Sequence, residues 1–162
     1  MNQSINNAPL TENLKKSLNT GLVPAINPVK DFFPHDVTMD SWFVIGHYEV
    51  EGHILNCLFQ LMITKNSGAP EVMNANLSIT DETTGWYHYE DHIYPLNVAQ
   101  IEEMGEGVEK KLSIKVPNGS LVGNLDEMHW EAEMPHGKFS LDMKSLGMCI
   151  YNAGTGNFTN AS

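Results

Sequence analysis

The sequence has few basic residues and no long apolar run, and each shortage excludes a class of protein. Only 9 of its 162 residues are Lys or Arg, against 20 Asp or Glu, which gives a formal net charge of -11. A surface that binds nucleic acid or an anionic membrane neutralises phosphates with Lys and Arg, so we expect neither partner. No run of eighteen apolar residues occurs, which predicts that no helix spans a membrane.

Cysteine is also scarce, and the N-terminal stretch has no export signal. Cys57 and Cys149 each lie inside an apolar run, where buried free thiols are expected. A single disulfide is the alternative, because pairing depends on geometry that a sequence does not contain. The first residues, MNQSINNAPLTENLKK, lack a basic start followed by an apolar core, so we expect a cytoplasmic protein, with a secreted mature chain as the alternative.

What the chain does contain is a succession of strand-like segments, beginning with WFVIGHYEVEGHILNCLFQLMIT over 42–64. Two runs rich in Val, Ile, Phe and Leu are joined at Val50-Glu51-Gly52-His53, which predicts a β-hairpin. In the second run the apolar residues fall on both parities, which indicates a central barrel strand covered on both faces. Gln60 interrupts this run, either as a hydrogen-bonded structural amide or as a ligand-facing amide in an apolar pocket.

Further strands with tight turns follow, and no β-α-β pattern is present. Alternation of apolar and polar residues predicts strands over 72–80, 86–95, 111–116, 120–124, 126–134, 138–143 and 146–151. The stretch 97–107 is ambiguous, since Val98, Ile101 and Met104 have helical spacing but two glycines follow; a short helix or a loop fits. Such a succession predicts an all-β fold, an antiparallel lipocalin-like barrel.

The domain organisation expected from these patterns is an N-terminal extension followed by one barrel. Within the extension, residues 1–30, a short helix is predicted from Pro9 to Gly21, with Thr11 as N-cap and leucines recurring every four residues. The barrel domain is expected over 31–158. A chain of this length suits a single core.

The densest polar cluster is Trp86-Tyr87-His88-Tyr89-Glu90-Asp91-His92. On a strand, His88 and His92 lie roughly 13 Å apart, too far to share one metal ion, and the zinc-protease helix motif is absent. They share a face with Trp86 and Glu90. This face is either a solvated rim or the polar wall of a pocket, and in the second case His88, Glu90 and His92 are candidates for proton transfer.

Two further histidines lie near the first strand. His35 is followed by Asp36, and a His beside a carboxylate can act as an oriented acid or base; since adjacent side chains rarely point at each other, the alternative is a structural role at the strand's start. His47 lies on the parity of Phe43 and Ile45, where a lone His is more often structural.

A resemblance to a known family emerges from an ordered set of short motifs. The chain has His35, a Trp-x-x-x-Gly strand from Trp42 to Gly46, a turn at Gly52, Phe59-Gln60 and a Thr80-Asp81 turn, and the end of the likeness is carried by Gly137–Met143 and Gly154-Thr155-Gly156. In this order it resembles the AttH family, which includes hydroxyneurosporene synthase (the carotenoid hydratase) and is similar to fungal Diels–Alderases. The chain departs from the family pattern at Phe43-Val44, where a Trp-Tyr pair is common.

The resemblance implies a lipocalin-like barrel, usually the first of two in tandem, that handles isoprenoid- or polyketide-derived substrates without a redox cofactor. We therefore expect no cofactor, and from the spacing of His88 and His92 we expect no metal. Residues attributed to acid catalysis lie largely in the second barrel, so none is carried over. His35, Trp42, His47 and Gln60 are implied as pocket or interface residues only. The partners then expected are an apolar small molecule and a second barrel, or a homodimer in its place.

Three functions follow from these observations. The first is a cofactor-independent hydratase or cyclase, with His35, His88, Glu90 and His92 as candidates for catalysis. The second is a non-catalytic barrel that binds an apolar ligand through Trp42, His47, Gln60 and Trp86. The third is a domain that docks onto a second barrel.

Overall fold

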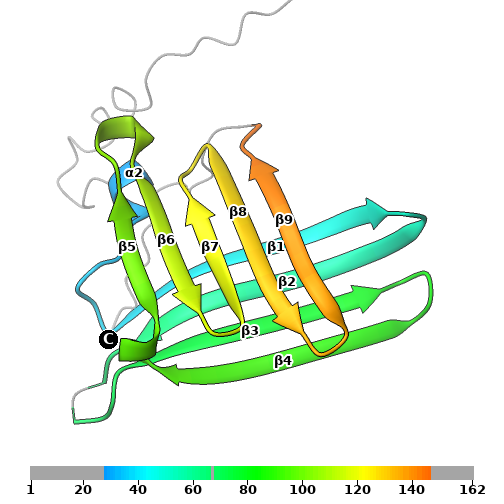
Figure 1. The fold of residues 1–162 in the computed structure, drawn as a ribbon, viewed down its shortest axis with the longest axis horizontal. Coiled ribbons are helices and arrows are strands. Elements are labelled where there is room, and N and C mark those ends of the chain that lie inside the picture. The colour runs from blue at the N-terminus through cyan, green and yellow to red at the C-terminus, as the bar shows by residue number, and fades with distance from the viewer. Residues whose placement is uncertain (1–27, 67, 147–162) are drawn as a thin grey trace, which may run out of the picture.

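The computed structural model describes residues 28–66 and 68–146, and they form two antiparallel sheets (Figure 1). This confirms the predicted all-β class. Sheet A has the order β1-β2-β3-β4 and sheet B the order β5-β6-β7-β8-β9. Sheet A consists of β1 (Met39–Val50), β2 (His53–Thr64), β3 (Val72–Asp81) and β4 (Trp86–Pro95). Sheet B consists of β5 (Gln100–Met104), β6 (Lys111–Val116), β7 (Gly119–Gly123), β8 (Glu127–Met134) and β9 (Gly137–Lys144).

Helical structure in the described part of the chain is limited to single turns. These are α2 (Pro28–Asp31) and the 3-10 turns η1 (Leu96–Val98) and η2 (Gly107–Glu109). None of the described helices has the length and apolar character needed to cross a membrane. The helix predicted over 9–21, and the strand predicted over 146–151 beyond Leu146, lie outside the described residues.

For the stretch 97–107 a short helix or a loop was expected, but its middle part is a strand. It contains strand β5, which pairs with β6 so that Ile101 lies opposite Ile114. The helical spacing of Val98, Ile101 and Met104 is overridden because pairing with β6 places Ile101 on the core cluster, and tertiary context outweighs local pattern in short segments.

The β1–β2 hairpin forms where it was predicted. Val50 pairs with His53, and the two residues between them have positive backbone φ angles, 51° at Glu51 and 84° at Gly52. A two-residue turn of this kind matches the twist of the flanking strands and requires a positive φ at both central positions. Gly52 meets this requirement without strain, which explains why the break falls here.

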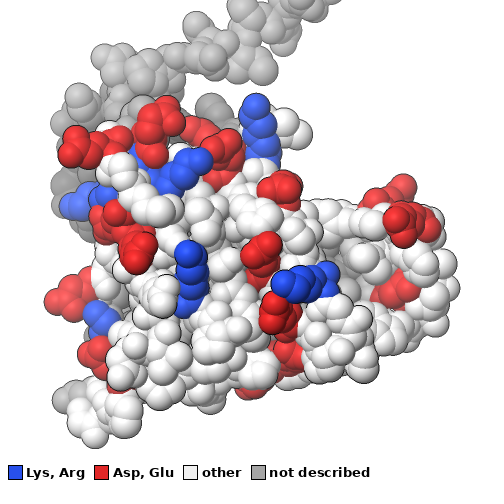
Figure 2. Space-filling model, in the orientation of Figure 1, with Lys and Arg blue, Asp and Glu red and all other residues white. Residues whose placement is uncertain are grey.

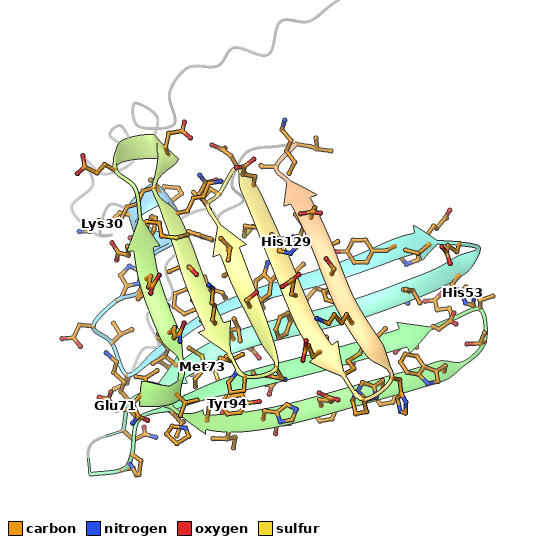
Figure 3. The ribbon with its side chains drawn as sticks, viewed as in Figure 1. Lys30, His53, Glu71, Met73, Tyr94 and His129 are labelled. Atoms are coloured by element: carbon orange, nitrogen blue, oxygen red, sulfur yellow. The ribbon has the colours of Figure 1, made fainter. Side chains whose placement is uncertain are left out.

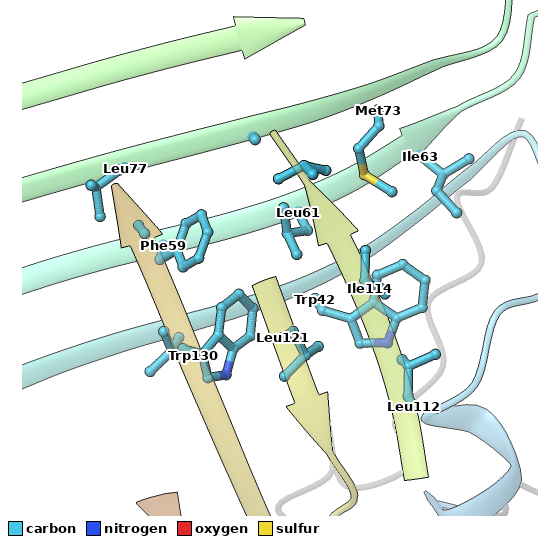
Figure 4. Close-up of a cluster of buried hydrophobic side chains, with 14 of the residues drawn as sticks. Trp42, Phe59, Leu61, Ile63, Met73, Leu77, Leu112, Ile114, Leu121 and Trp130 are labelled. Atoms are coloured by element: carbon cyan, nitrogen blue, oxygen red, sulfur yellow. The ribbon is translucent and has the colours of Figure 1, made fainter. Parts of the chain in front are cut away.

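The two sheets cross at a steep angle and enclose a filled core (Figure 1, Figure 4), as in orthogonal sandwiches. Phe59 of sheet A and Trp130 of sheet B meet edge to face with their ring centroids 4.9 Å apart. Both are essentially inaccessible to solvent, as are their large apolar neighbours. The core cluster around them includes Leu61, Met73, Leu77, Leu112, Ile114 and Leu121.

The barrel expected from the sequence does not close among the described residues. β1 and β4 form the edges of sheet A, and β5 and β9 form those of sheet B. The chain passes from β4 to β5 through η1, and these two strands do not pair. Period-two alternation specifies the buried face of each strand but says nothing about edge pairing, so an open sandwich fits the same pattern.

Strand β2 is central, as predicted, but it is covered on one face only. Its inner face is buried through Cys57, Phe59, Leu61 and Ile63. The opposite residues, Gln60 among them, are half-buried, and the described residues place no second layer over them. The apolar residues on both parities were therefore a misleading indication of a two-sided cover.

Gly46, the last residue of the Trp-x-x-x-Gly motif, has a steric reason to be glycine. The Tyr48 ring lies over it, so that a Cβ on Gly46 would fall 2.1 Å from the Tyr48 hydroxyl. Cys57 pairs with Gly46 across the hairpin and is a buried free thiol. Burial raises the pKa of Cys57, so the thiol stays protonated. The predicted buried free thiol is confirmed for Cys57, and Cys149 lies outside the described residues.

Asp81 links the β1–β2 turn to the β3–β4 turn, which lie at the same end of sheet A. Its carboxylate accepts a hydrogen bond from the Thr84 hydroxyl at 2.5 Å and from the Thr83 backbone N–H at 3.0 Å. It also lies 2.8 Å from Nδ1 of His53, the first residue of β2 after the β1–β2 turn, and His53 is labelled in Figure 3. The hydrogen bond from Thr84, with those from His53 and Thr83, outweighs burial and lowers the pKa of Asp81 to about 2.

Asp81 should therefore contribute an acid-sensitive part of the stability. Because the pKa is lowered on folding, the contribution is fully present above about pH 4, the usual range for an unfolded Asp, and is lost as the pH falls toward 2. We expect the urea midpoint of Asp81→Asn to lie well below that of the natural chain at pH 6 and to converge with it near pH 2. Glu49→Gln, at an exposed position of β1, is the matched control; an equal midpoint difference at both pH values contradicts the assignment.

Candidate functional site

The side chains best suited to binding or catalysis lie on the inner face of edge strand β4. In sheet A the strand next to it, β3, turns buried apolar side chains inward. Strand β4 continues this face with polar and aromatic side chains, called here the β4 row: Trp86, His88, Glu90, His92 and Tyr94. Because β4 is the last strand of sheet A, the β4 row lies at the open edge of the core. In register, His88 lies opposite Ile79, Glu90 opposite Leu77, His92 opposite Ala75 and Tyr94 opposite Met73.

Glu90 joins the two histidines of this row. Its Oε1 lies 3.0 Å from Nε2 of His88, and its Oε2 lies 3.0 Å from Nε2 of His92. The Glu90 and His88 side chains are only 12% and 15% exposed. The sequence predicted correctly that the imidazoles share a face, but it did not predict the bridge. No group of three or more His, Cys, Asp or Glu side chains within the described ranges could hold a metal ion.

The electrostatics of the row favour an ionised Glu90. Burial raises the pKa of Glu90, but the hydrogen bonds from His92 and His88 lower it by more, so the net change is downward. An ionised carboxylate can only accept hydrogen bonds, so each Nε2 must carry a proton. The Nδ1 atoms of both rings have no hydrogen bond to a described residue and are left to accept or donate a proton.

Aromatic rings flank the row at both ends. Trp86 stacks on His88 with centroids 5.7 Å apart, and Tyr94 stacks on His92 at 5.8 Å. The ring of His136, from the β8–β9 turn, meets His88 edge-on at 5.9 Å. The row is thus enclosed between stacked rings and faced by a turn of sheet B, which fixes the orientation of both imidazoles.

A second turn of sheet B contacts the row at Tyr94. The Tyr94 hydroxyl donates to Oδ1 of Asn118 at 3.0 Å, between β6 and β7. Nδ2 of Asn118 and Nε1 of Trp130 are both buried without a hydrogen-bond partner, and such groups in a native interior call for an explanation. No sequence signal marks Asn118 or His136 beyond their place in turns, whereas Tyr94 could have been found from its parity with Glu90.

The structure places the remaining predicted residues elsewhere. Trp42 is buried in the core, and its Nε1 donates to the Phe32 carbonyl at 2.7 Å, so it holds the segment before β1 in place. His35 pairs with Asp40, its Nδ1 lying 3.2 Å from Oδ2, and not with the adjacent Asp36. Both residues therefore act at the start of β1, away from the β4 row.

His47 and Gln60 lie on the outer face of sheet A, on the opposite side from the row. Nδ1 of His47 lies 3.1 Å from Oδ1 of Asn56, and Nδ2 of Asn76 donates to Oε1 of Gln60 at 3.4 Å. The predicted site residues are thus divided among the β4 row, the start of β1 and the outer face, and they do not form one pocket.

Two shallow grooves follow sheet B, and none of the predicted site residues lines either of them. One, of about 310 Å³, is lined by Lys115, Glu131 and Lys138 among others, and the second, of about 420 Å³, by Lys111, Glu127 and Asp142 among others. Figure 2 shows acidic and basic side chains interspersed on the sheet B face. Their charges pair locally, since Lys111 lies 2.6 Å from Glu127 and Lys138 2.8 Å from Glu133.

Comparison of the chain with protein-family models, with curated proteins and with solved structures finds no match in any of the three. The resemblance to the AttH family stays a prediction that depends on its own motifs. The geometry of the β4 row is independent of that resemblance.

Proposed function

We propose that this chain is an all-β module that binds an apolar, isoprenoid- or polyketide-like small molecule along the β4 row. The observation that carries the proposal is the Glu90 carboxylate held between two imidazoles beside an exposed indole. Binding sites for small molecules are mostly apolar and contain a few convergent polar groups, often with altered pKa values. Glu90, His88 and His92 are the convergent polar groups here, and the pKa of Glu90 is lowered by its contacts with the two rings. The apolar part of the site lies next to them.

An uncovered shelf, apolar apart from the buried Asp81 carboxylate, adjoins the row and supports an apolar ligand. Figure 1 shows the turn ends of sheet A extending past β9. Tyr48, Leu55 and Trp86 face inward there, because they lie in register with one another through Asp81. Trp86 is 41% exposed, and Tyr48 and Leu55 are half-buried. A ligand on this shelf would place its polar end near His88.

The chemistry available to such a ligand is proton transfer. Each Nε2–H donates to Glu90, which orients the ring and stabilises an imidazolium. Nδ1 can then deliver a proton to an alkene carbon or remove one from a water molecule, which are the steps that hydration or cyclisation requires. Catalysis of this kind requires that the ligand first binds on the shelf.

Addition of geranylgeraniol, an isoprenoid alcohol, tests the site through Trp86. Of the three tryptophans, Trp42 and Trp130 are buried and Trp86 is exposed, so a ligand on the shelf removes water from Trp86 alone. We expect a saturable blue shift of the emission in the natural chain and none in Trp86→Phe. A shift that persists in Trp86→Phe, or no saturable shift at all, contradicts the proposal.

Glu90→Gln separates binding from catalysis. The amide has the size of the carboxylate but no charge, so it cannot stabilise an imidazolium. We expect the Kd measured from the blue shift to stay within about fivefold of the natural value, because a single lost polar contact at a partly wet site costs about 1 kcal/mol or less. Product analysis by mass, for gain of one water molecule, should show hydration in the natural chain and none in Glu90→Gln. Hydration by both proteins excludes Glu90 from the reaction.

Docking onto a second barrel, or onto another copy of the chain, is the second candidate. It is favoured by the open edges of the described sheets at β1, β4, β5 and β9, because an unpaired strand edge is a template for pairing with another chain. Light scattering tests this function, because docking between two copies through a strand edge produces a dimer. Asp91→Pro, in edge strand β4, should weaken that dimer.

A further inference from the structure

The outer face of sheet A carries a second arrangement of side chains that the proposed function does not use. It is formed by the residues of β1–β4 that point away from sheet B. Paired registers align them in rows across the four strands. The central rows are Phe43–Gln60–Asn76–Asp91 and Ile45–Leu58–Ser78–Tyr89, and the flanking rows are His47–Asn56–Thr80–Tyr87 and Ser41–Met62–Asn74–Ile93.

The two edges of this face carry large exposed apolar side chains among their polar residues. Phe43 and Ile45 on β1, and Tyr87, Tyr89 and Ile93 on β4, are each more than half exposed. Three strand spacings separate β1 from β4, which is roughly 14 Å. The edges therefore form two parallel walls along the strand direction, with the outer residues of β2 and β3 as the floor between them.

The floor is largely polar and uncharged. On β3 it consists of Asn74, Asn76, Ser78 and Thr80, all half-buried, and on β2 amides and a threonine alternate with apolar residues. Its amides are only partly satisfied, since Asn76 donates to Gln60 and Asn74 donates to Thr64 at 3.3 Å. Nε2 of Gln60 and Oδ1 of Asn74 have no hydrogen bond to the described residues, so they can serve a ligand.

Charge on this face excludes anionic ligands. Its charged residues are Glu49 and Asp91, both acidic and exposed, and no Lys or Arg lies on the outward parity of any of its four strands. Phosphate and sulfate groups require cationic or clustered backbone donors. A ligand that suits this face is therefore neutral.

A protein partner fits the arrangement poorly. Protein interfaces have an apolar centre and a polar rim, whereas here the centre is mostly amides and hydroxyl groups and the most exposed apolar side chains lie at the rim. A chain of neutral sugars has the required chemistry, because its hydroxyl groups can bond to amides and its C–H faces can pack on aromatic rings. We propose that the outer face of sheet A binds a neutral polysaccharide, with the sugar chain running along the strands between Phe43 and Tyr89.

Affinity electrophoresis in native gels that contain soluble neutral polysaccharides tests this proposal. The panel is xyloglucan, galactomannan, mixed-linkage β-glucan, arabinoxylan, soluble starch and dextran. We expect at least one to retard the natural chain. Tyr89→Ala should then weaken binding about tenfold, the effect of losing about 1.4 kcal/mol of ring packing, and Gln60→Ala should weaken it several-fold. Because Tyr89 is exposed, its replacement leaves the unfolding midpoint unchanged.

Two controls make the result decisive. Trp86→Phe alters the shelf on the other face and should leave retardation unchanged, which separates this proposal from the ligand site above. Heparin, a sulfated polysaccharide, should give no retardation. The proposal is overturned if no neutral polysaccharide retards the chain, if Tyr89→Ala is retarded as strongly as the natural chain, or if light scattering shows a dimer that Tyr89→Lys converts to monomer.

Discussion

Replacing Gly119 by alanine is expected to lower the free energy of unfolding by about 3 kcal/mol, at the upper end of the usual cost of overpacking. A Cβ on Gly119 would lie 2.5 Å from the Glu131 carbonyl oxygen, 3.3 Å from Cα of Ala132 and 3.0 Å from Cζ of Phe59. The first two are backbone atoms of the paired strand β8 and cannot turn aside. Urea unfolding, followed by tryptophan fluorescence, measures the change.

The direction of this effect is the informative part. At an unconstrained position, Gly→Ala stabilises a protein by about 0.4–1 kcal/mol, because the unfolded chain loses freedom. Ser140→Ala, on the exposed face of β9, is the matched control and should change the free energy of unfolding by less than about 0.5 kcal/mol. A neutral or stabilising Gly119→Ala would mean that β8 does not approach Gly119 of β7 as closely as described.

Alternation of side chains was enough to predict most of the strands and their buried faces. Trp130 and Ala132 in β8 are buried, and Glu131 between them is exposed, as their parity indicated. Such predictions succeed because a one-residue slip would move a whole apolar set into solvent. Strand β5 escaped prediction because it is short and its one inward apolar residue, Ile101, gains its burial only from β6.

The candidate site was predicted in part. His88, Glu90 and His92 were placed on one face from their spacing alone, and the structure brings them into contact. The position of this face at the open edge of the core could not be predicted, because it depends on which strand ends the sheet. Contacts with His136 and Asn118 were equally out of reach, since turns of the other sheet supply them.

The contact between Phe59 and Trp130 should be the energetic centre of the fold. Replacing Trp130 by alanine removes the largest fully buried side chain, and we expect a loss of about 3–5 kcal/mol. Phe59→Ala should cost a similar amount. Because the two rings touch edge to face at 4.9 Å, the double mutant should lose about 0.5–1.5 kcal/mol less than the sum of the single mutants. Additive losses would contradict a direct contact.

Trp130→Phe distinguishes packing from polarity at the same position. Nε1 of Trp130 is buried without an acceptor, and an unsatisfied buried donor costs about 1–3 kcal/mol. Phenylalanine leaves a cavity where the larger ring was, but it also removes the unsatisfied N–H. We therefore expect Trp130→Phe to cost less than half as much as Trp130→Ala in urea unfolding at neutral pH. A cost equal to that of alanine would show that the indole nitrogen is stabilised in the folded chain, and it would place an acceptor next to Trp130 in the core.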